Sequence, residues 1–338
     1  MRDIKNFNLL EHNTFGIDVS CRRFVEFEKA SEVTPFVCSL DESDLPLLII
    51  GGGSNLLFTD NFQGTILRSA IKGVETTAGE DGHVFVRCGS GEKWDDIVSL
   101  CVDHGWYGME NLSLIPGDVG ASAVQNIGAY GAEVKDIIWS IEAVDIDTGL
   151  TVTLSPRDCE YGYRDSRFKR EWKNKYFITA VTYRLSEIFT PQLDYGNIRG
   201  ELGKLGIAKP NARQLRQVII DIRNAKLPDV KVEGNAGSFF VNPVVPEEKY
   251  LELSATYPDM PHYRLDDGKV KIPAGWLIEQ CGWKGRSVGN VGVHDKQALV
   301  LVNKGGASGK EVLALCDEVR ADVLNRFGIK IFTEVNVI

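Results

Sequence analysis

The chain has 338 residues, of which 43% are hydrophobic and 25% charged, a composition typical of a globular protein with two or three domains. Its formal net charge of −9 argues against a nucleic-acid-binding protein, although a local basic pocket can still bind an anion. The first residues lack the apolar core of a signal peptide and no apolar segment is long enough to span a membrane, so we expect a cytoplasmic protein without a membrane partner.

Short strand-like runs and turn signals alternate in the N-terminal part of the chain. A helix follows them from Trp94, because Trp94, Ile97, Val98 and Cys101 recur at the spacing of one helical face, with charged residues between them. The strands are predicted, in chain order, at 22–27, 47–50, 65–67 and 84–86.

Two more strands are predicted at 140–146 and 176–185, followed by a long helix at 211–225. This helix must stop at Leu227-Pro228, because proline lacks an amide proton and disfavours helix in the residue before it. Pro228 therefore marks the first domain boundary that the sequence predicts.

The last predicted helix begins at a capping box that runs from Ser308 to Glu311, carries one apolar stripe and ends at Gly328. A closing strand is predicted at 330–338. Numerous short strands with irregularly placed helices favour an α+β fold over a regular βαβ series.

Cysteine and histidine patterns argue against disulfide and metal chemistry. Seven cysteines are scattered without a Cys-x-x-Cys pair, so we expect reduced, mostly buried thiols. The five histidines are isolated and show no ligand spacing, so no metal is predicted.

The first segment that can carry chemistry is a strand that enters three glycines, Gly51-Gly52-Gly53-Ser54-Asn55-Leu56. Without Cβ atoms the backbone amides can approach a diphosphate closely, and Ser54 and Asn55 add side-chain donors. The dinucleotide fingerprint GxGxxG fails because Leu56 occupies its third glycine position. Taken alone, the segment favours a structural hairpin or loop over phosphate binding.

A second segment, Ile115–Gly131, consists mainly of small residues. Such a run loses chain entropy and buries little apolar surface, so it makes sense where backbone lies against a flat, rigid ligand such as isoalloxazine. The alternative is a tight turn between packed elements.

Three polar side chains lie in distinctive surroundings. Arg164 stands near two tyrosines and beside an acid, where it forms either a surface ion pair or a guanidinium fork for a carboxylate. Ser238 lies between small residues and two phenylalanines but in no nucleophile elbow, so acyl transfer is unsupported, and its hydroxyl could instead donate a proton to a strongly basic carbanion. Glu334 lies in an otherwise apolar terminal strand and points either to solvent or into a site.

Together these segments resemble the type I UDP-N-acetylenolpyruvoylglucosamine reductases, flavoenzymes that make UDP-N-acetylmuramate for peptidoglycan. The resemblance begins at Asn13 and covers nearly the whole chain. It rests on seven motifs in the right order: GGGSNLLF, IPGDVGASAVQNIGAYG, GYRDS, LDYGN, KLPD, GNAGSFFVNP and TEV. The sequence departs from many members at Thr333, where they have proline before the glutamate.

The resemblance implies an FAD-binding fold of the vanillyl-alcohol-oxidase (PCMH) type with a separate α+β substrate-binding domain. Residues 1–70 would form the N-terminal part of the FAD-binding region and 71–228 its main domain, to which 329–338 returns. Residues 229–328 would form the substrate-binding domain.

The resemblance also implies the reaction and its residues. NADPH would reduce non-covalently bound FAD, and hydride would then pass to UDP-N-acetylglucosamine enolpyruvate, with Arg164 stabilising charge, Glu334 assisting as an acid and Ser238 donating a proton. The protein is expected to be a monomer. FAD would contact Gly51, Gly52, Gly53, Ser54, Asn55, Leu56, Pro116, Gly117, Gly120, Ala121, Ser122, Ile127, Gly128 and Arg223. The substrate would contact Tyr195, Lys226, Asn242, Tyr263, Lys284 and Gln297.

Two other functions remain as alternatives. One is a flavin oxidoreductase of the same fold with another substrate, and the other is a silent flavin- or nucleotide-sugar-binding module. The joint presence of Arg164, Ser238 and Glu334 argues against both.

Overall fold

The computed structural model describes residues 1–338, and the chain divides into two compact units. The first unit contains residues 1–7, 21–52 and 63–225, and the second contains 8–20, 53–62 and 226–338. Both units are therefore built from segments that are separated in sequence. No helix of the structure is long and apolar enough to cross a membrane.

The first unit is built on two sheets. A five-stranded antiparallel sheet has the order β11-β10-β12-β7-β6, and a four-stranded sheet has the order β1-β2-β5-β3 with β3 and β5 parallel. The strands are β1 (Arg2–Asn8), β2 (Ser20–Phe27), β3 (Leu47–Ile50), β5 (Phe62–Ser69), β6 (Val74–Ala78), β7 (His83–Gly89), β8 (Gly128–Ala129), β9 (Ala132–Glu133), β10 (Ile138–Asp145), β11 (Thr151–Leu154) and β12 (Tyr176–Ser186).

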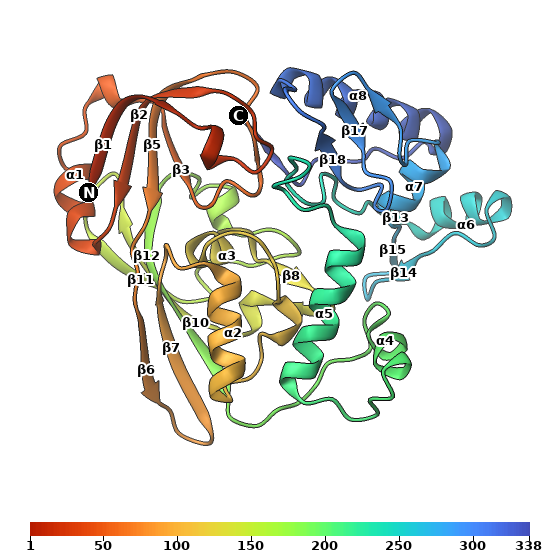
Figure 1. Cartoon of the computed structure of the whole chain (residues 1–338), viewed down its shortest axis with the longest axis horizontal. Helices are drawn as coiled ribbons and strands as arrows, with labels where there is room; N and C mark the ends of the chain where they lie inside the picture. Colours follow the sequence, from red (N-terminus) through yellow and green to blue (C-terminus); the bar gives the residue numbers. More distant parts are fainter. The chain divides into compact units, whose positions relative to one another are not determined.

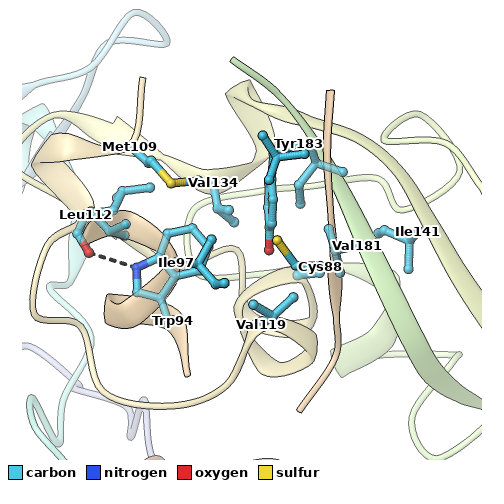
Figure 2. Close-up of a cluster of buried hydrophobic side chains, with 14 of the residues drawn as sticks. Cys88, Trp94, Ile97, Met109, Leu112, Val119, Val134, Ile141, Val181 and Tyr183 are labelled. Atoms are coloured by element: carbon cyan, nitrogen blue, oxygen red, sulfur yellow. Dashed lines mark hydrogen bonds between the residues drawn. The ribbon is translucent and has the colours of Figure 1, made fainter. Parts of the chain in front are cut away.

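The main core of this unit lies between the five-stranded sheet and two helices, α2 (Trp94–His104) and α3 (Val119–Gln125) (Figures 1 and 2). Trp94, fully buried, donates its indole proton to the Leu112 carbonyl at 2.8 Å, and its ring meets Tyr183 edge to face. Burying these aromatic side chains fixes α2 against the sheet and therefore fixes where α3 begins.

Three more helices complete the first unit: α1 (Val33–Val37), α4 (Ile198–Lys204) and α5 (Ala212–Lys226). The buried residues of α5 recur at helical spacing and pack with α4 in a separate cluster. The helix ends at Lys226, directly before Leu227-Pro228, as predicted.

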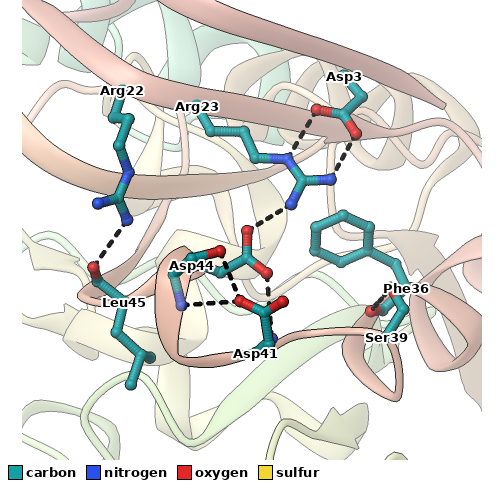
Figure 3. Close-up of polar contacts among 9 residues, drawn as sticks. Asp3, Arg22, Arg23, Phe36, Ser39, Asp41, Asp44 and Leu45 are labelled. Carbon is teal, nitrogen blue, oxygen red and sulfur yellow. Dashed lines mark hydrogen bonds and ion pairs between the residues drawn. The ribbon is translucent and has the colours of Figure 1, made fainter.

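An ion-pair cluster ties the first strands of this unit to the turn before β3 (Figure 3). Arg23 on β2 donates two hydrogen bonds to the Asp3 carboxylate, at 2.9 and 2.6 Å, and a third to Asp44 at 2.5 Å. Hydrogen bonding from Arg23 lowers the pKa of the Asp3 carboxyl. Arg22 donates to the Leu45 carbonyl at 2.8 Å, so both arginines hold the approach to β3 and to the glycines that follow it.

The second unit combines short sheets with three helices. Its sheets have the orders β13-β15-β14 and β16-β17-β18, and β4 pairs in parallel with β19. Helix α8 packs on β17, β18 and α7. The elements are β4 (Leu56–Leu57), β13 (Val244–Pro246), α6 (Glu247–Thr256), β14 (Tyr263–Arg264), β15 (Lys269–Lys271), α7 (Ala274–Gln280), β16 (Ser287–Val288), β17 (Val291–Val293), β18 (Leu301–Asn303), α8 (Gly309–Phe327) and β19 (Asn336–Val337).

Most predicted elements are confirmed, including the capping box of α8 and its left-handed end at Gly328. The prediction of one closing strand at 330–338 is wrong. This segment makes only an antiparallel bridge at Thr333, to Phe240, and then the two-residue strand β19 beside β4. The segment changes partner after Glu334, so it cannot form one continuous ladder. Five of the seven cysteines are buried thiols, as expected.

Candidate active site

The start of the glycine-rich segment, Gly51 and Gly52, lies beside the second small-residue segment in the first unit. A Cβ atom on Gly51 would stand 2.9 Å from the Ala121 Cβ, and one on Gly52 would stand 3.4 Å from the Gly117 Cα. Gly120 is equally close to its neighbours, because a Cβ there would lie 3.0 Å from the Ser90 Cβ. The glycines therefore allow the turn after β3 to pack directly on the backbone around α3.

Residues 119 to 125 of the second segment form a helix, which the sequence analysis did not predict. The amides at its start are already bonded within the protein, since Val119 N–H donates to the Glu92 carbonyl at 2.8 Å and Gly120 N–H to the Ser90 carbonyl at 2.9 Å. The start of α3 thus docks onto the loop between β7 and α2. The Gly120 amide is therefore already used in a hydrogen bond within the protein.

Asp118 precedes α3 and has unusual surroundings for an acid. It is 7% exposed, its side chain makes no helix-cap hydrogen bond, and its Oδ2 atom has no hydrogen-bond partner. Burial raises its pKa to about 6, and the charges of Arg68, Lys72 and Lys93 oppose this shift. Asp118 was not among the predicted site residues, although it is the only acidic residue between Ile115 and Gly131.

Arg164 is held against the end of the same segment. Its φ of 55° is left-handed, and its guanidinium donates to the carbonyls of Asn126 (3.4 Å) and Gly128. A Cβ on Gly128 would stand 2.6 Å from the Arg164 Nη1 atom. The guanidinium of Arg164 is bonded to these backbone carbonyls, which hold it at the end of α3.

Asn126 supports this arrangement and was not predicted. It is fully buried, and its φ of 47° is left-handed. Its side chain donates to the Gly162 carbonyl at 2.7 Å and accepts from the Lys135 amide at 3.1 Å. Asn126 therefore connects the end of α3 to the turn that carries Arg164.

Two further predicted residues lie in the first unit. The Nε atom of Arg223, on α5, is buried without a hydrogen-bond partner. Burial lowers the pKa of Arg223, and the nearby charge of Arg164 adds to this effect. Tyr195, 45% exposed, lies against Gly131, where a Cβ would be 3.3 Å from the Tyr195 Cβ.

The remaining residues of the glycine-rich segment belong to the second unit. Gly53 has a φ of 68°, and a Cβ there would stand 2.0 Å from the His12 carbonyl oxygen, so a side chain is excluded. Leu56 lies on β4 beside β19. The Asn55 side chain donates to the Glu334 carbonyl at 3.3 Å.

Two of the predicted catalytic residues come from adjacent segments of this unit. The Glu334 amide donates to the Phe239 carbonyl at 2.8 Å, so the backbone of Glu334 lies beside that of Ser238. The Asn55 contact adds the glycine-rich segment to the same place. Ser238 and Glu334, which follow Asn55 by about 180 and 280 positions in the sequence, are thus brought together with it.

The predicted substrate residues of the second unit are spread over several elements. Asn242 Oδ1 accepts from the Ala274 amide at 2.9 Å, and Gln297 Oε1 accepts from the Leu299 amide at 3.3 Å, so both also stabilise local structure. Lys284 pairs with Glu279 at 2.9 Å. Tyr263, 49% exposed, lies on β14 with the Lys271 Nζ 5.5 Å from its ring centroid, and Lys226 is exposed at the end of α5.

A large cofactor with polar groups needs polar protein atoms that are free to bind it and backbone that it can approach closely because no Cβ atoms are in the way. The first unit contains both: Asp118 Oδ2, in the second small-residue segment, and Arg223 Nε, on α5, are two of its four buried unpaired side-chain atoms, and Gly51 and Gly52 supply the bare backbone. An open cavity of about 560 Å³ in this unit is lined instead by Leu45–Leu47, Ile146, Asp147 and Asn174, and it contains none of the predicted site residues.

Two known family profiles match separate parts of the chain. Residues 21–155 match the sequence profile described as FAD binding domain, and residues 228–338 match UDP-N-acetylenolpyruvoylglucosamine reductase, C-terminal domain. The first profile includes both small-residue segments, and the second includes Ser238 and Glu334.

Two relatives that match almost the whole chain have the same name. A UDP-N-acetylenolpyruvoylglucosamine reductase of Bacteroides fragilis (strain YCH46) is 54% identical over 334 residues, which cover 99% of both chains. One from Paraburkholderia phymatum is 44% identical over 98% of this chain and 96% of the relative.

A solved structure confirms the predicted fold. The UDP-N-acetylenolpyruvylglucosamine reductase (MurB) of Thermus caldophilus superposes with a TM-score of 0.67 at 21% identity, covering 99% of this chain and 98% of that one. The chain belongs to the UDP-N-acetylenolpyruvoylglucosamine reductase family of flavin-dependent oxidoreductases, and FAD is its cofactor.

Proposed function

We propose that the protein reduces UDP-N-acetylglucosamine enolpyruvate to UDP-N-acetylmuramate, with NADPH as the source of hydride. The observation that carries this proposal is the hydrogen bond from the Glu334 amide to the Phe239 carbonyl. This bond makes Glu334 and Ser238 neighbours beside the glycine-rich segment. An assisting acid and a proton donor that act at one flavin site must lie close together in this way.

Bound FAD would supply a two-electron carrier that is reduced by NADPH and then delivers hydride to the terminal carbon of the enolpyruvyl group. The attack leaves carbanionic, enolate-like charge next to the substrate carboxylate. Arg164 would stabilise that charge, because its guanidinium is held by backbone carbonyls and needs no reorganisation. The charge of Arg223 on the same unit would add to the attraction for an anion.

Ser238 would give its hydroxyl proton to the carbanion. A serine is a poor acid, so this step needs a strongly basic partner and fixed placement. Gly237 has a φ of 69° and Phe239 is fully buried, so the backbone on both sides of Ser238 is constrained. Glu334 would assist in its protonated form.

The substrate's nucleotide and sugar would be held by Tyr195, Lys226, Asn242, Tyr263, Lys284 and Gln297. Lys284 would leave Glu279 to meet the negatively charged diphosphate, since an exposed ion pair contributes little and is readily exchanged. Tyr263 would close over that diphosphate from β14.

The proposed domains follow the sequence analysis: residues 1–70 and 71–228 would bind FAD, with 329–338 returning to them, and residues 229–328 would bind substrate. Cβ-free contacts at Gly51, Gly52 and Gly120 support the first assignment. We further propose that the protein is a cytoplasmic monomer that binds neither nucleic acid nor a membrane.

An anaerobic experiment tests the reaction. Purified protein should be yellow, should bleach when NADPH is added, and should regain its colour when UDP-N-acetylglucosamine enolpyruvate follows. Bleaching without recovery would reject this substrate in favour of another flavin oxidoreductase of the same fold. Absence of bound flavin after titration with FAD would reject the whole proposal.

Replacing Ser238 by alanine tests the proton-donor role. We expect Ser238→Ala to bleach with NADPH at the normal rate, because this half-reaction needs no serine proton, and to slow recovery with substrate by orders of magnitude. Stopped-flow absorbance separates the two halves. An equal loss in both halves would contradict the role.

A further inference from the structure

Asp118 is an acidic side chain at a place where a diphosphate is expected. Its Oδ1 atom lies 3.4 Å from the position of a Cβ on Gly52, and its Oδ2 lies 3.6 Å from that on Gly51. The carboxyl group therefore stands directly over the backbone that would cradle the cofactor's phosphates. An ionised carboxylate in this position would repel the diphosphate.

The ordinary role of such a residue does not apply to Asp118. An aspartate before the first turn of a helix usually accepts a hydrogen bond from the second or third amide of that helix. Here the side chain makes no such bond, and the Gly120 amide donates to the Ser90 carbonyl instead. The carboxyl group has turned away from α3 and toward Gly51 and Gly52.

No basic residue neutralises Asp118 through a short contact. Arg68, from β5, is nearest at 4.0 Å, and it forms its close ion pair with Glu26 of β2, which also accepts from Arg2 at 3.2 Å. Lys72, after β5, donates to the Gly91 carbonyl at 2.5 Å and pairs with Glu92 at 3.3 Å. Lys93 forms a backbone bridge with Asp118 before α2, and its charge acts on the carboxyl group without a short ion pair.

We propose that the carboxyl group of Asp118 is neutral when FAD is bound and donates a hydrogen bond to an oxygen of the FAD diphosphate. This proposal rests on the cofactor site proposed above. The geometry for this role is the unpaired Oδ2 atom beside Gly51 and Gly52, on a side chain that is only 8% exposed. A protonated carboxyl is the only form of this side chain that can donate.

The consequence is an affinity for FAD that depends on pH. The pKa of Asp118 is raised to about 6 by burial without ligand, and a diphosphate would raise it further. Binding then takes up a proton above pH 6, and the dissociation constant should rise roughly tenfold between pH 7 and pH 8, because each pH unit lowers the neutral fraction tenfold.

The test follows release of flavin from the full-length holoenzyme. The protein is diluted at pH values from 5.5 to 8.5, and the released FAD is measured by its fluorescence, without any turnover. We expect the wild type to lose FAD as pH rises, and Asp118→Asn, which donates at every pH, to show no such trend and to bind at least tenfold more tightly than wild type at pH 8. Asp96→Asn is the matched control, because Asp96 is exposed in the first turn of α2, and it should keep the wild-type profile.

Two outcomes overturn the proposal: FAD affinity of the wild type that is constant or rises with pH, and an Asp118→Asn variant that follows the wild-type pH profile. If the asparagine variant fails to fold, Asp118→Ser and calorimetric titration of the wild type in two buffers decide instead, since uptake of a proton on binding near pH 7 is required. Failure of the wild type to bind FAD at any pH would instead reject the cofactor site itself.

Discussion

Arg164 is positioned by the backbone of a neighbouring turn. Its guanidinium donates to the Asn126 and Gly128 carbonyls, and a Cβ on Gly128 would meet both its Nη1 atom (2.6 Å) and the Ala132 carbonyl oxygen (2.8 Å). A methyl group there must displace either a charged side chain or the strand pair β8–β9. Gly128 therefore determines where the positive charge stands.

We expect Gly128→Ala to slow the recovery of flavin colour with substrate by at least roughly tenfold, which corresponds to about 1.4 kcal/mol of transition-state stabilisation. Bleaching with NADPH should change much less. Gly203→Ala is the matched control, because a Cβ at that helical position meets nothing within 4 Å. Equal slowing of both half-reactions would show that Gly128 acts on flavin binding and leave the positioning role without support.

At the scale of single residues, the sequence indicates which side chains can carry out chemistry better than it indicates their surroundings. The motifs predict catalytic roles for Arg164, Ser238 and Glu334, and the bond from the Glu334 amide to the Phe239 carbonyl makes two of these residues neighbours. Asn126 and Asp118 were not predicted as site residues. Their importance depends on a left-handed φ and on a missing cap hydrogen bond, and neither can be recognised from the residue type alone.

Helix α8 shows which elements a sequence can predict. Ser308 accepts from the Glu311 amide at 3.3 Å, and the Glu311 carboxylate accepts from the Ser308 amide at 2.7 Å, which completes the predicted capping box. Local bonds of this kind involve residues three positions apart, so their signal lies within one short window of sequence.

Ser308→Ala should destabilise the protein by about 1 kcal/mol, because the amide at the third helical position loses its acceptor. Ser308→Asp keeps an acceptor and should stay close to wild type, although the nearby Glu311 carboxylate reduces its benefit slightly. Urea unfolding followed by circular dichroism measures both. Equal stability of the alanine variant and wild type would mean that the cap contributes nothing to α8.

Elements that depend on distant partners were harder to predict. The segment 330–338 is apolar and strand-like, yet its pairing is divided between Phe240 and β4, and both partners lie far away in sequence. Helix α3 was missed for another reason: its residues are small and its apolar face is short, so no helical period stands out.

At the scale of the whole molecule, residues 1–70 look like one continuous part in sequence but are divided between the two units. The Thr14 amide donates to the Gly53 carbonyl (3.2 Å) and the Thr14 carbonyl accepts from the Asn235 amide (2.9 Å), which draws residues 8–20 and 53–62 into the second unit. A local pattern cannot encode a contact between residues more than 200 positions apart, whereas the boundary after α5 is marked locally by Pro228.

Asp118 also gives the whole protein a pH dependence that can be measured without FAD. Its pKa is raised by burial from 3.8 to about 6, so the folded state disfavours the ionised form. The stability associated with this group is complete below about pH 4 and is lost as pH rises through about 6. At pH 8 the loss is on the order of 3 kcal/mol, because each unit of pKa shift corresponds to about 1.4 kcal/mol.

Asp118→Asn removes the ionisation, so flavin-free variant protein should be more stable than flavin-free wild type at pH 8 and about equal to it at pH 4.

Asp95 is a control of opposite sign. Burial of its carboxylate is outweighed by hydrogen bonds from Arg216, at 2.7 and 2.9 Å, and from the Leu114 amide, so its pKa is lowered and its contribution is lost as pH falls. Asp95→Asn should therefore destabilise the protein at pH 8. Thermal unfolding of both variants at the two pH values checks these signs, and an Asp118→Asn variant less stable than wild type at pH 8 would show that the folded protein stabilises the Asp118 carboxylate.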